Sequence, residues 1–215
     1  MSTLEKMDAF FNARAKSYDG HMLNDLGLEE FYEVIAAQFL ALKDTDRLLD
    51  LGCGTGLELE RLFQKCPGLH VTGIDLSDAM LSVCKDKFQN LNLHLICGSY
   101  FDTALEKGSY GYALSTYSLH HFSKDQKRSL YQRIYAALAP EGMFVLGDYT
   151  VKTREEEDFH LNESLRLSDT NLPGTYHYDT PFTKETETSL IKDAGFSDIR
   201  IVRKWENTTV FVAVR

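Results

Sequence analysis

The stretch DLGCGTG, residues 50–56, decides how the chain folds, because an apolar run (46–52) leads into it and an amphipathic helix follows it. Glycines at such a turn let a ligand approach the backbone closely, and the helix N-terminus offers unpaired N–H groups. The next apolar run, LHVTGID (69–75), ends in Asp75, 23 residues after Gly52. A carboxylate at the end of the neighbouring strand can accept both hydroxyls of a ribose. Together the two features predict a nucleoside cofactor.

The spacing of the glycines separates the kinds of nucleoside cofactor. A dinucleotide site has the pattern G-x-G-x-x-G, whereas this turn has G-x-G-x-G. Asp50 precedes the turn by two residues. A carboxylate there would repel a pyrophosphate and would suit an ammonium group. We therefore expect a nucleoside that carries an amino acid, and a nicotinamide or nucleotide-sugar enzyme is the least favoured reading.

Short apolar runs alternate with amphipathic helices along the rest of the chain. After the two runs above, the strand-like runs are residues 91–98, 110–117, 143–149, 197–205 and 208–215. Helices are indicated at residues 57–66, after Ser77, after the capping box Ser123/Gln126, and at residues 183–194. This alternation predicts a doubly wound, parallel α/β sheet. The last two runs are joined by two residues, which allows a hairpin but no parallel crossover, so the sheet should end in an antiparallel pair.

Six segments resemble the class I S-adenosylmethionine-dependent methyltransferases, and the likeness extends from about residue 10 over nearly the whole chain. The segments are FFNARAKSYD (10–19), LLDLGCGTGLELERL (48–62), GIDLSDAML (73–81), STYSLHHF (115–122), LAPEGMFVLGD (138–148) and KDAGFSDIRIV (192–202). The resemblance implies a Rossmann-like, doubly wound, mostly parallel seven-stranded sheet with an antiparallel C-terminal strand. It also implies one methyltransferase-like domain (1–215), with an N-terminal helical lid (1–44) and a substrate-cover insertion (151–180).

The same resemblance implies S-adenosylmethionine as cofactor and assigns binding roles by position. Asp50, Gly52, Gly54 and Gly56 would surround its methionine part, with Thr116 or Tyr117 facing the same part, Asp75 on the ribose, Leu76 on the adenine and Tyr18 closing the lid. After Gly98 the family often has an acid that takes the adenine amino group. This chain has Ser99 and Tyr100 there instead, and the Ser99 hydroxyl is the expected substitute.

The candidate catalytic residues are those that could take a proton from the acceptor: His120, His121, Asp148 and His177. A base is needed only if the attacking atom must lose a proton. The pair His120-His121 also suggests a metal site. Adjacent side chains diverge by about 100° on a helix and point to opposite faces of a strand, so neighbours rarely share an ion. We therefore expect one buried packing histidine, one exposed histidine and no metal.

The composition of the chain limits the kinds of molecule that it is expected to bind or act on. The chain has 215 residues and a formal net charge of −9, which disfavours a large nucleic-acid substrate. Segment 115–118 reads STYS and lacks the prolines of the Asn-Pro-Pro-Tyr motif used on extruded bases and amino groups. Four cysteines without a C-x-x-C pair indicate reduced thiols, and neither a signal peptide nor a membrane span is apparent. These features predict a cytoplasmic protein that acts on a small-molecule acceptor, with no nucleic-acid or membrane partner, and that could form a homodimer.

Two other functions remain open at this stage. The bound sulfonium could be converted into a modified cofactor by an enzyme of the same fold, which would place a basic residue beside the methyl group. The chain could also be a non-catalytic regulatory protein that binds S-adenosylmethionine, which would leave no polar group in the acceptor cavity.

Overall fold

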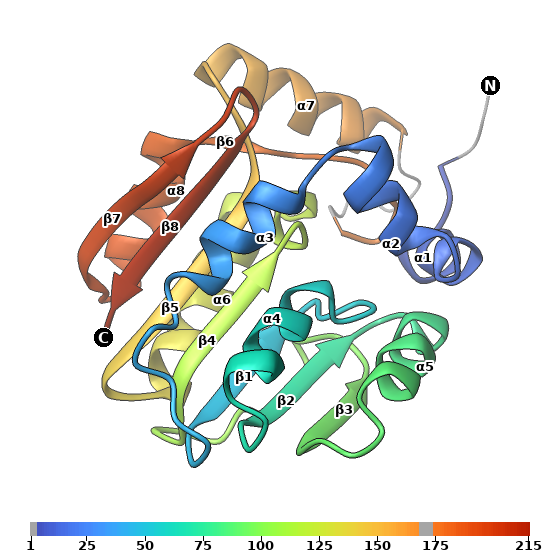
Figure 1. Cartoon of the computed structure of the whole chain (residues 1–215). Coiled ribbons are helices and arrows are strands. Elements are labelled where there is room, and N and C mark those ends of the chain that lie inside the picture. The colour runs from blue at the N-terminus through green and yellow to red at the C-terminus, as the bar shows by residue number, and fades with distance from the viewer. Residues whose placement is uncertain (1–3, 168–173) are drawn as a thin grey trace.

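An eight-stranded, mostly parallel sheet organises the computed structural model, which describes residues 4–167 and 174–215 (Figure 1). The strands are β1 (Arg47–Leu51), β2 (His70–Asp75), β3 (Leu93–Cys97), β4 (Tyr110–Thr116), β5 (Leu138–Val151), β6 (Phe182–Thr183), β7 (Ser197–Lys204) and β8 (Thr208–Val214). Their order is β3-β2-β1-β4-β5-β8-β7, and β8 runs antiparallel to both of its neighbours. The predicted sheet is thus confirmed. The addition is β6, a two-residue strand that pairs with the end of β5.

The helices follow the predicted alternation. They are α1 (Met7–Arg14), α2 (Tyr18–Gly20), a π-helical turn (His21–Asp25), α3 (Glu29–Ala36), α4 (Leu57–Lys65), α5 (Asp78–Lys87), a 3₁₀ turn (Leu119–His121), α6 (Lys124–Ala137), α7 (Arg154–Leu167) and α8 (Lys184–Asp193). The predicted start signals of α5 and α6 are confirmed. The Ser77 hydroxyl accepts from the Met80 amide, and Ser123 forms a capping box with Gln126.

Helices cover both faces of the sheet. Figure 1 shows α3 and α4 in front of it and α6 and α8 behind it. Each layer buries an apolar stripe against the strands: Leu130 and Ile134 of α6 on one face, Ile35 of α3 and Leu62 of α4 on the other. Burying two apolar faces of one sheet is what requires helices on both sides.

Only the first part of the expected N-terminal lid lies away from the core. Helix α3, within the 1–44 segment, places Phe31, Tyr32 and Ile35 in the core at 2 % exposure or less. Helices α1 and α2 lie instead at the end of the molecule toward which the arrows of β2 and β4 point (Figure 1). Helix α3 therefore belongs to the helical layer, because its apolar face matches the sheet, and a lid made by α1 and α2 stays a prediction.

The expected cover segment, residues 151–180, contains α7 and a loop of which residues 174–179 are described; residues 168–173 lie outside the described part. This loop pairs with the start of the lid. Lys6 and Tyr176 form an isolated antiparallel bridge, and the Met7 amide donates to the Thr175 carbonyl at 3.1 Å. The two segments thus meet over the carboxyl ends of the parallel strands, where open α/β sheets bind their ligands.

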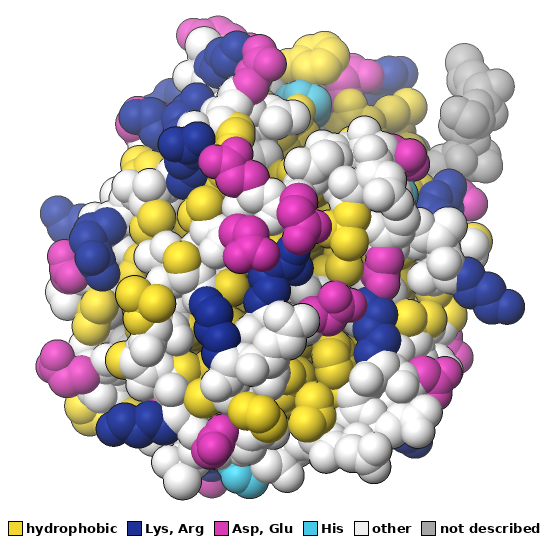
Figure 2. All heavy atoms as spheres, in the orientation of Figure 1, with side chains coloured by type: hydrophobic (Ala, Val, Ile, Leu, Met, Phe, Trp, Pro, Cys, Tyr) yellow, Lys and Arg dark blue, Asp and Glu magenta, His cyan; other side chains and the backbone are white. Residues whose placement is uncertain are grey.

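Acidic and basic side chains are interspersed over the face drawn in Figure 2. Among the helices of residues 4–167 and 174–215, none is long and apolar enough to cross a membrane.

A buried ion pair joins α6 to α8 and generates a stability prediction. Lys127 Nζ lies 2.7 Å from Glu187 Oε2, both residues are at most 1 % exposed, and the Tyr131 hydroxyl donates to the same carboxylate. Replacing Glu187 by Leu leaves the Lys127 charge buried and unpaired, which should cost about 3–5 kcal/mol in the free energy of unfolding. Urea denaturation of Glu187→Leu measures this cost.

The double variant Lys127→Met/Glu187→Leu is the matched control, since it removes both charges. It should recover most of the loss. Equal losses in the single and double variants would show that shape, and not the unpaired charge, sets the cost.

Candidate active site

The glycine turn between β1 and α4 has the backbone that only glycine adopts readily. Gly52, Gly54 and Gly56 have φ values of 78°, 47° and 76°. A Cβ atom on Gly52 would collide with the Ser118 side chain, whereas one on Gly54 would meet no atom within 4 Å. Gly54 therefore faces open space, and Gly52 is held against the segment that follows β4.

Asp75, at the end of β2, is tied to this turn. Its carboxylate accepts the Gly54 amide at 2.9 Å on one oxygen and the Ser77 amide at 2.8 Å on the other. Burial raises the pKa of Asp75, while these backbone donors act in the opposite direction. The carboxylate is thus fixed beside the turn with its remaining lone pairs available to hydroxyl donors.

Asp50 lies beneath the turn and does not line a cavity. It is fully buried, and neither of its carboxylate oxygens has a hydrogen-bond partner. Burial and the neighbouring Glu58, itself 4 % exposed, raise the pKa of Asp50 well above its usual range, and burial raises the pKa of Glu58 to about 7. Two buried carboxyl groups, one from β1 and one from the first turn of α4, therefore lie together beneath the glycine turn, where a cation above them would be stabilised.

Tyr117, directly after β4, holds a strained backbone. Its φ of 45° is in the left-handed region, unusual for a bulky side chain, and its hydroxyl is 2.7 Å from Thr208 Oγ1. Strain of this kind persists where surrounding contacts fix the residue. It turns the Tyr117 ring into the space between two cavities.

The first cavity, of about 50 Å³, lies at the glycine turn. Of the residues predicted to bind the cofactor, it brings together Tyr18, Gly52, Gly54, Asp75, Leu76, Tyr100, Thr116 and Tyr117. Asp50, Gly56 and Ser99 do not line it. Ser99 lies outside this lining, and its hydroxyl accepts the Phe101 amide at 3.1 Å in a local turn, so its contact with adenine stays a prediction. Met7, Phe11, Met80, Ser118 and Phe122 line the cavity and were not predicted.

The second cavity, of about 480 Å³, adjoins the first. Phe11, Tyr18, Tyr117 and His121 line both of them. Three of the four candidate catalytic residues, His120, His121 and His177, line the second cavity, and Asp148 lies behind His120. A side chain that sequence reasoning missed, Asp179, lines it as well. The candidate catalytic side chains therefore lie mainly around the second cavity, and most of the expected cofactor-binding residues lie around the first.

His120 is held by Asp148 at the end of β5. The two side chains are 2.5 Å apart through Nδ1, and the Asp148 carboxylate also accepts the amides of Leu119 and Tyr149. Burial alone would lower the pKa of His120, but the carboxylates of Asp148 and Asp179 raise it to about 9. Asp148 thus fixes the ring so that Nε2 points away from β5.

His121 is buried too, contrary to the expectation of one exposed histidine. The exposed fraction is 7 % for His120 and 3 % for His121, and the two ring centroids are 4.0 Å apart. The tight 3₁₀ turn places both rings under the loop 174–179, so the divergence expected for a longer helix does not separate them. Burial and the charge on His120 lower the pKa of His121 to about 3.

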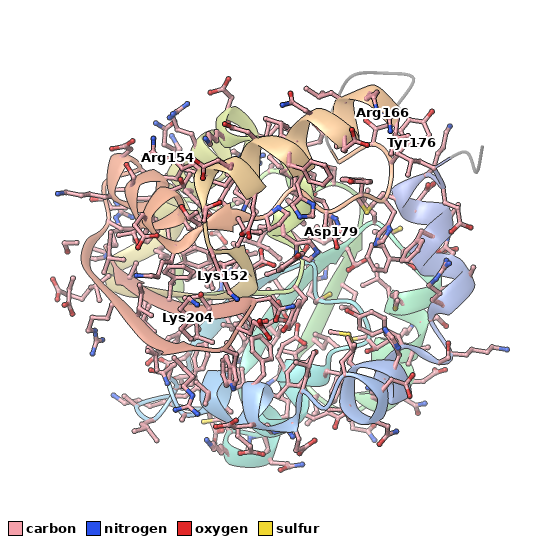
Figure 3. All side chains as sticks on the ribbon, turned by 90° about the horizontal axis from the view of Figure 1, so that it is seen from above. Lys152, Arg154, Arg166, Tyr176, Asp179 and Lys204 are labelled. Carbon is pink, nitrogen blue, oxygen red and sulfur yellow. The ribbon has the colours of Figure 1, made fainter. Side chains whose placement is uncertain are left out.

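Asp179 joins the two rings from the loop. Its Oδ1 is 3.4 Å from His120 Nε2 and 3.4 Å from His121 Nδ1. Burial opposes ionisation, yet the hydrogen bond and charge of His120 hold the pKa of Asp179 well below its usual range. Figure 3 shows Asp179 toward the middle of the view, with Arg154 and Arg166 nearer its edge.

The sequence of this chain is similar to those of known methyltransferases and related proteins. The methyltransferase domain family matches residues 48–142, which run from β1 into the turn within β5. A carboxy-S-adenosyl-L-methionine synthase of Nautilia profundicola is 24 % identical over 81 % of this chain and 79 % of its own length. The chain is thus similar in sequence to methyltransferase domains over residues 48–142, and to a protein named for S-adenosylmethionine chemistry over most of its length.

Solved structures of similar fold extend the likeness beyond the matched segment. A candidate O-methyltransferase of Nostoc punctiforme superposes with a TM-score of 0.72 at 22 % identity, over 98 % of this chain and 61 % of that one. Phosphoethanolamine N-methyltransferase 2 of Haemonchus contortus, in complex with S-adenosyl-L-methionine, gives 0.66 at 20 % identity, over 87 % of this chain and 52 % of that one. This chain thus spans between one half and two thirds of the length of these methyltransferase-fold structures.

The buried carboxyl pair beneath the glycine turn generates a pH prediction. The pKa of Glu58 is about 7 in the folded protein and about 4.5 in the unfolded chain. Between pH 4.5 and pH 7 the folded protein therefore binds more protons than the unfolded chain does. The free energy of unfolding should therefore fall as pH rises from about 4.5 to 7, and stay low above it. Glu58→Gln, which cannot ionise, should be more stable than wild type by about 1–3 kcal/mol at pH 8.

Urea titrations at pH 5 and pH 8 measure the difference. Glu60→Gln, on the same helix but paired with Lys87 and partly exposed, is the control and should keep the wild-type pH profile. A Glu58→Gln profile as steep as wild type would contradict the assignment.

Proposed function

We propose that this chain transfers a methyl group from S-adenosylmethionine, bound at the glycine turn, to a small-molecule acceptor bound in the second cavity. The observation that carries the proposal is the common wall of the two cavities, made by Phe11, Tyr18, Tyr117 and His121. A group held in the first cavity and a group held in the second can therefore meet across the shared wall.

The residues of the first cavity fit the cofactor. Asp75 offers a fixed carboxylate to two neighbouring hydroxyls, and the open face of Gly54 allows close backbone approach. The buried carboxyl groups of Asp50 and Glu58 lie beneath the turn, and an ammonium group bound above them would favour their ionised forms. S-Adenosylmethionine supplies a sulfonium whose methyl group is already activated toward displacement.

The lid controls access to the first cavity. Met7 and Phe11 of α1 line it, and its volume of about 50 Å³ has room for only a few water molecules. Asn12 accepts from the Ser77 hydroxyl at 2.6 Å, and Asp19 accepts from the Thr55 hydroxyl at 2.5 Å. Outward movement of the lid would admit a nucleoside, and these two hydrogen bonds, one from α1 and one from α2, would close the lid again and exclude water.

The chain's own residues would act mainly by alignment. Displacement at a sulfonium methyl needs the acceptor atom in line with the carbon–sulfur bond, and positioning supplies much of the rate. Tyr117, fixed by Thr208, would set this line from the end of β4. His120, His121 and His177 are the groups in the second cavity that could receive an acceptor proton, and their roles stay predictions.

The charged and polar residues that line the two cavities help to weigh methyl transfer against the other two functions, conversion of the cofactor and regulation without catalysis. The described residues that line the first cavity include no Lys or Arg, and Arg14 of the second is paired with Glu5 at 3.2 Å. A cofactor that had gained a carboxylate would seek such a cation, so conversion of the sulfonium is the weaker candidate. The histidines and Asp179 give the second cavity the polar groups that a purely regulatory protein would not need. A cytoplasmic location, a homodimer and the absence of nucleic-acid partners stay predictions.

Cofactor binding is tested at Asp75. Asp75→Asn keeps the shape but leaves one acceptor oxygen in place of two, so the affinity for S-adenosylhomocysteine should fall at least about tenfold. Isothermal titration calorimetry measures it, and Asp102→Asn, an exposed acid in the next loop, is the control. Unchanged affinity in Asp75→Asn would place the ribose elsewhere.

Methyl transfer is tested with S-adenosylmethionine labelled in its methyl group and a panel of phenols, thiols, carboxylic acids and amines. We expect acceptor-dependent release of S-adenosylhomocysteine and a product heavier by one methyl group. Phe10→Ala, which alters only the second cavity, should raise KM for the acceptor and leave S-adenosylhomocysteine affinity within about twofold. A carboxylated nucleoside product, or cofactor binding with no turnover on any acceptor, would favour one of the two alternatives.

A further inference from the structure

Two histidines and an aspartate converge in the wall of the second cavity. His120 and His121 come from the turn after β4, and Asp179 comes from the loop 58 residues further on. One ligand atom of each lies within 4.8 Å of the others. All three residues line the second cavity.

The separations from Asp179 also match those between two ligands of one metal ion, although the His120–Asp179 contact serves as a long hydrogen bond when no ion is bound. Both nitrogen–oxygen distances to Asp179 Oδ1 are 3.4 Å, longer than the usual 2.7–3.2 Å of a side-chain hydrogen bond. In a tetrahedral zinc site with ligands at about 2.0–2.1 Å, two ligands of the same ion are about 3.4 Å apart. The two measured distances equal that edge.

Two oxygen atoms lie near His121 Nδ1, and the single proton on that nitrogen can form a hydrogen bond to only one of them. Its Nδ1 is 3.2 Å from the Tyr178 carbonyl oxygen and 3.4 Å from Asp179 Oδ1, and an Nδ1–H group points at one of them. His120 Nε2, once it has released its proton, adds a third ligand atom on the other side of the carboxylate. A cation between these atoms would interact favourably with all of them.

The ring of His120 is oriented as metal-binding histidines are. Nδ1 is engaged by the Asp148 carboxylate, which leaves Nε2 toward Asp179 and the cavity. A carboxylate on the far nitrogen fixes the tautomer and raises the basicity of the nitrogen that binds the metal. Asp148 is itself fixed by the backbone amides of Leu119 and Tyr149.

We propose that His120, His121 and Asp179 bind a divalent ion of the zinc class in the wall of the second cavity. Two nitrogens and one carboxylate oxygen are the ligand types that zinc takes in catalytic sites, where a fourth position stays open. All three side chains line the second cavity, so an open position on the ion would be reached from that cavity.

The acceptor class follows from that open position and rests on the proposed function. A hydroxyl or thiol that coordinates the ion loses its proton to solvent more readily. The resulting anion attacks the methyl carbon, the carbon–sulfur bond breaks with its electron pair on sulfur, and a neutral thioether is left. Acceptors with an oxygen or sulfur donor are therefore expected over amines.

The ion is tested first without any cofactor. Full-length, tag-free protein stripped with a chelator is titrated with Zn²⁺ by calorimetry and with Co²⁺ by visible spectroscopy, which reports tetrahedral coordination. Cys97→Ser is the background, because this exposed thiol can itself bind zinc. We expect one equivalent per chain and an intense visible Co²⁺ band.

Variants then test the ligands. Asp179→Asn and His121→Ala should weaken binding at least tenfold, and Asp148→Asn, which acts through His120, should weaken it about 10–100-fold. His94→Ala, an exposed histidine on the edge strand β3, is the matched control and should change nothing. Circular dichroism and urea denaturation verify that each variant is folded.

Substoichiometric binding, or binding that Asp179→Asn and His121→Ala leave intact, would overturn the metal site. The result is independent of the proposed function. Zinc bound at these residues without S-adenosylhomocysteine binding would reject the function alone, and methyl transfer undiminished after chelation would reject the ion alone.

Discussion

The hydrogen bond from the Gly54 amide to the Asp75 carboxylate is the interaction on which the rest of the site depends. It joins the turn after β1 to the end of β2, so the glycine turn and the acid keep one fixed relation. That relation exists because parallel neighbours in an α/β sheet end at the same edge. The first cavity, the lid above it and the buried carboxyl pair below it are all arranged around this bond.

The second cavity depends on a different pair of strand ends. Asp148 at the end of β5 holds His120 from the turn after β4, and the neighbouring Tyr117 is forced into a left-handed backbone. These strained and buried groups are costly for stability and lie where two ligands would meet. Such clustering is typical of functional sites. The lid and the loop 174–179 then close both cavities through their own backbone pairing.

Much of the fold, and eight of the residues that line the first cavity, were predictable from the sequence. Apolar runs with helix caps between them marked the strands and helices, and the two-residue link before β8 required an antiparallel end of the sheet. Asp75 and Gly54 were predicted because Asp75 ends the short strand β2 and Gly54 lies in the glycine turn after β1. Phe11 and Met7 were not predicted as lining residues, because the spacing of a short helix does not tell where the helix docks.

Local sequence thus determined the elements, their order and the glycine turn with its acid, because periodicity, capping and φ preference act over a few residues. Tertiary structure alone decided that Asp50 is buried beneath the turn, that Ser99 turns away from the cavity and that Asp179 meets His120 and His121. The last contact spans 58 residues and depends on how the loop 174–179 folds back across the strand ends. No local preference encodes such a distance, since it is set by the packing of the whole sheet and its cover.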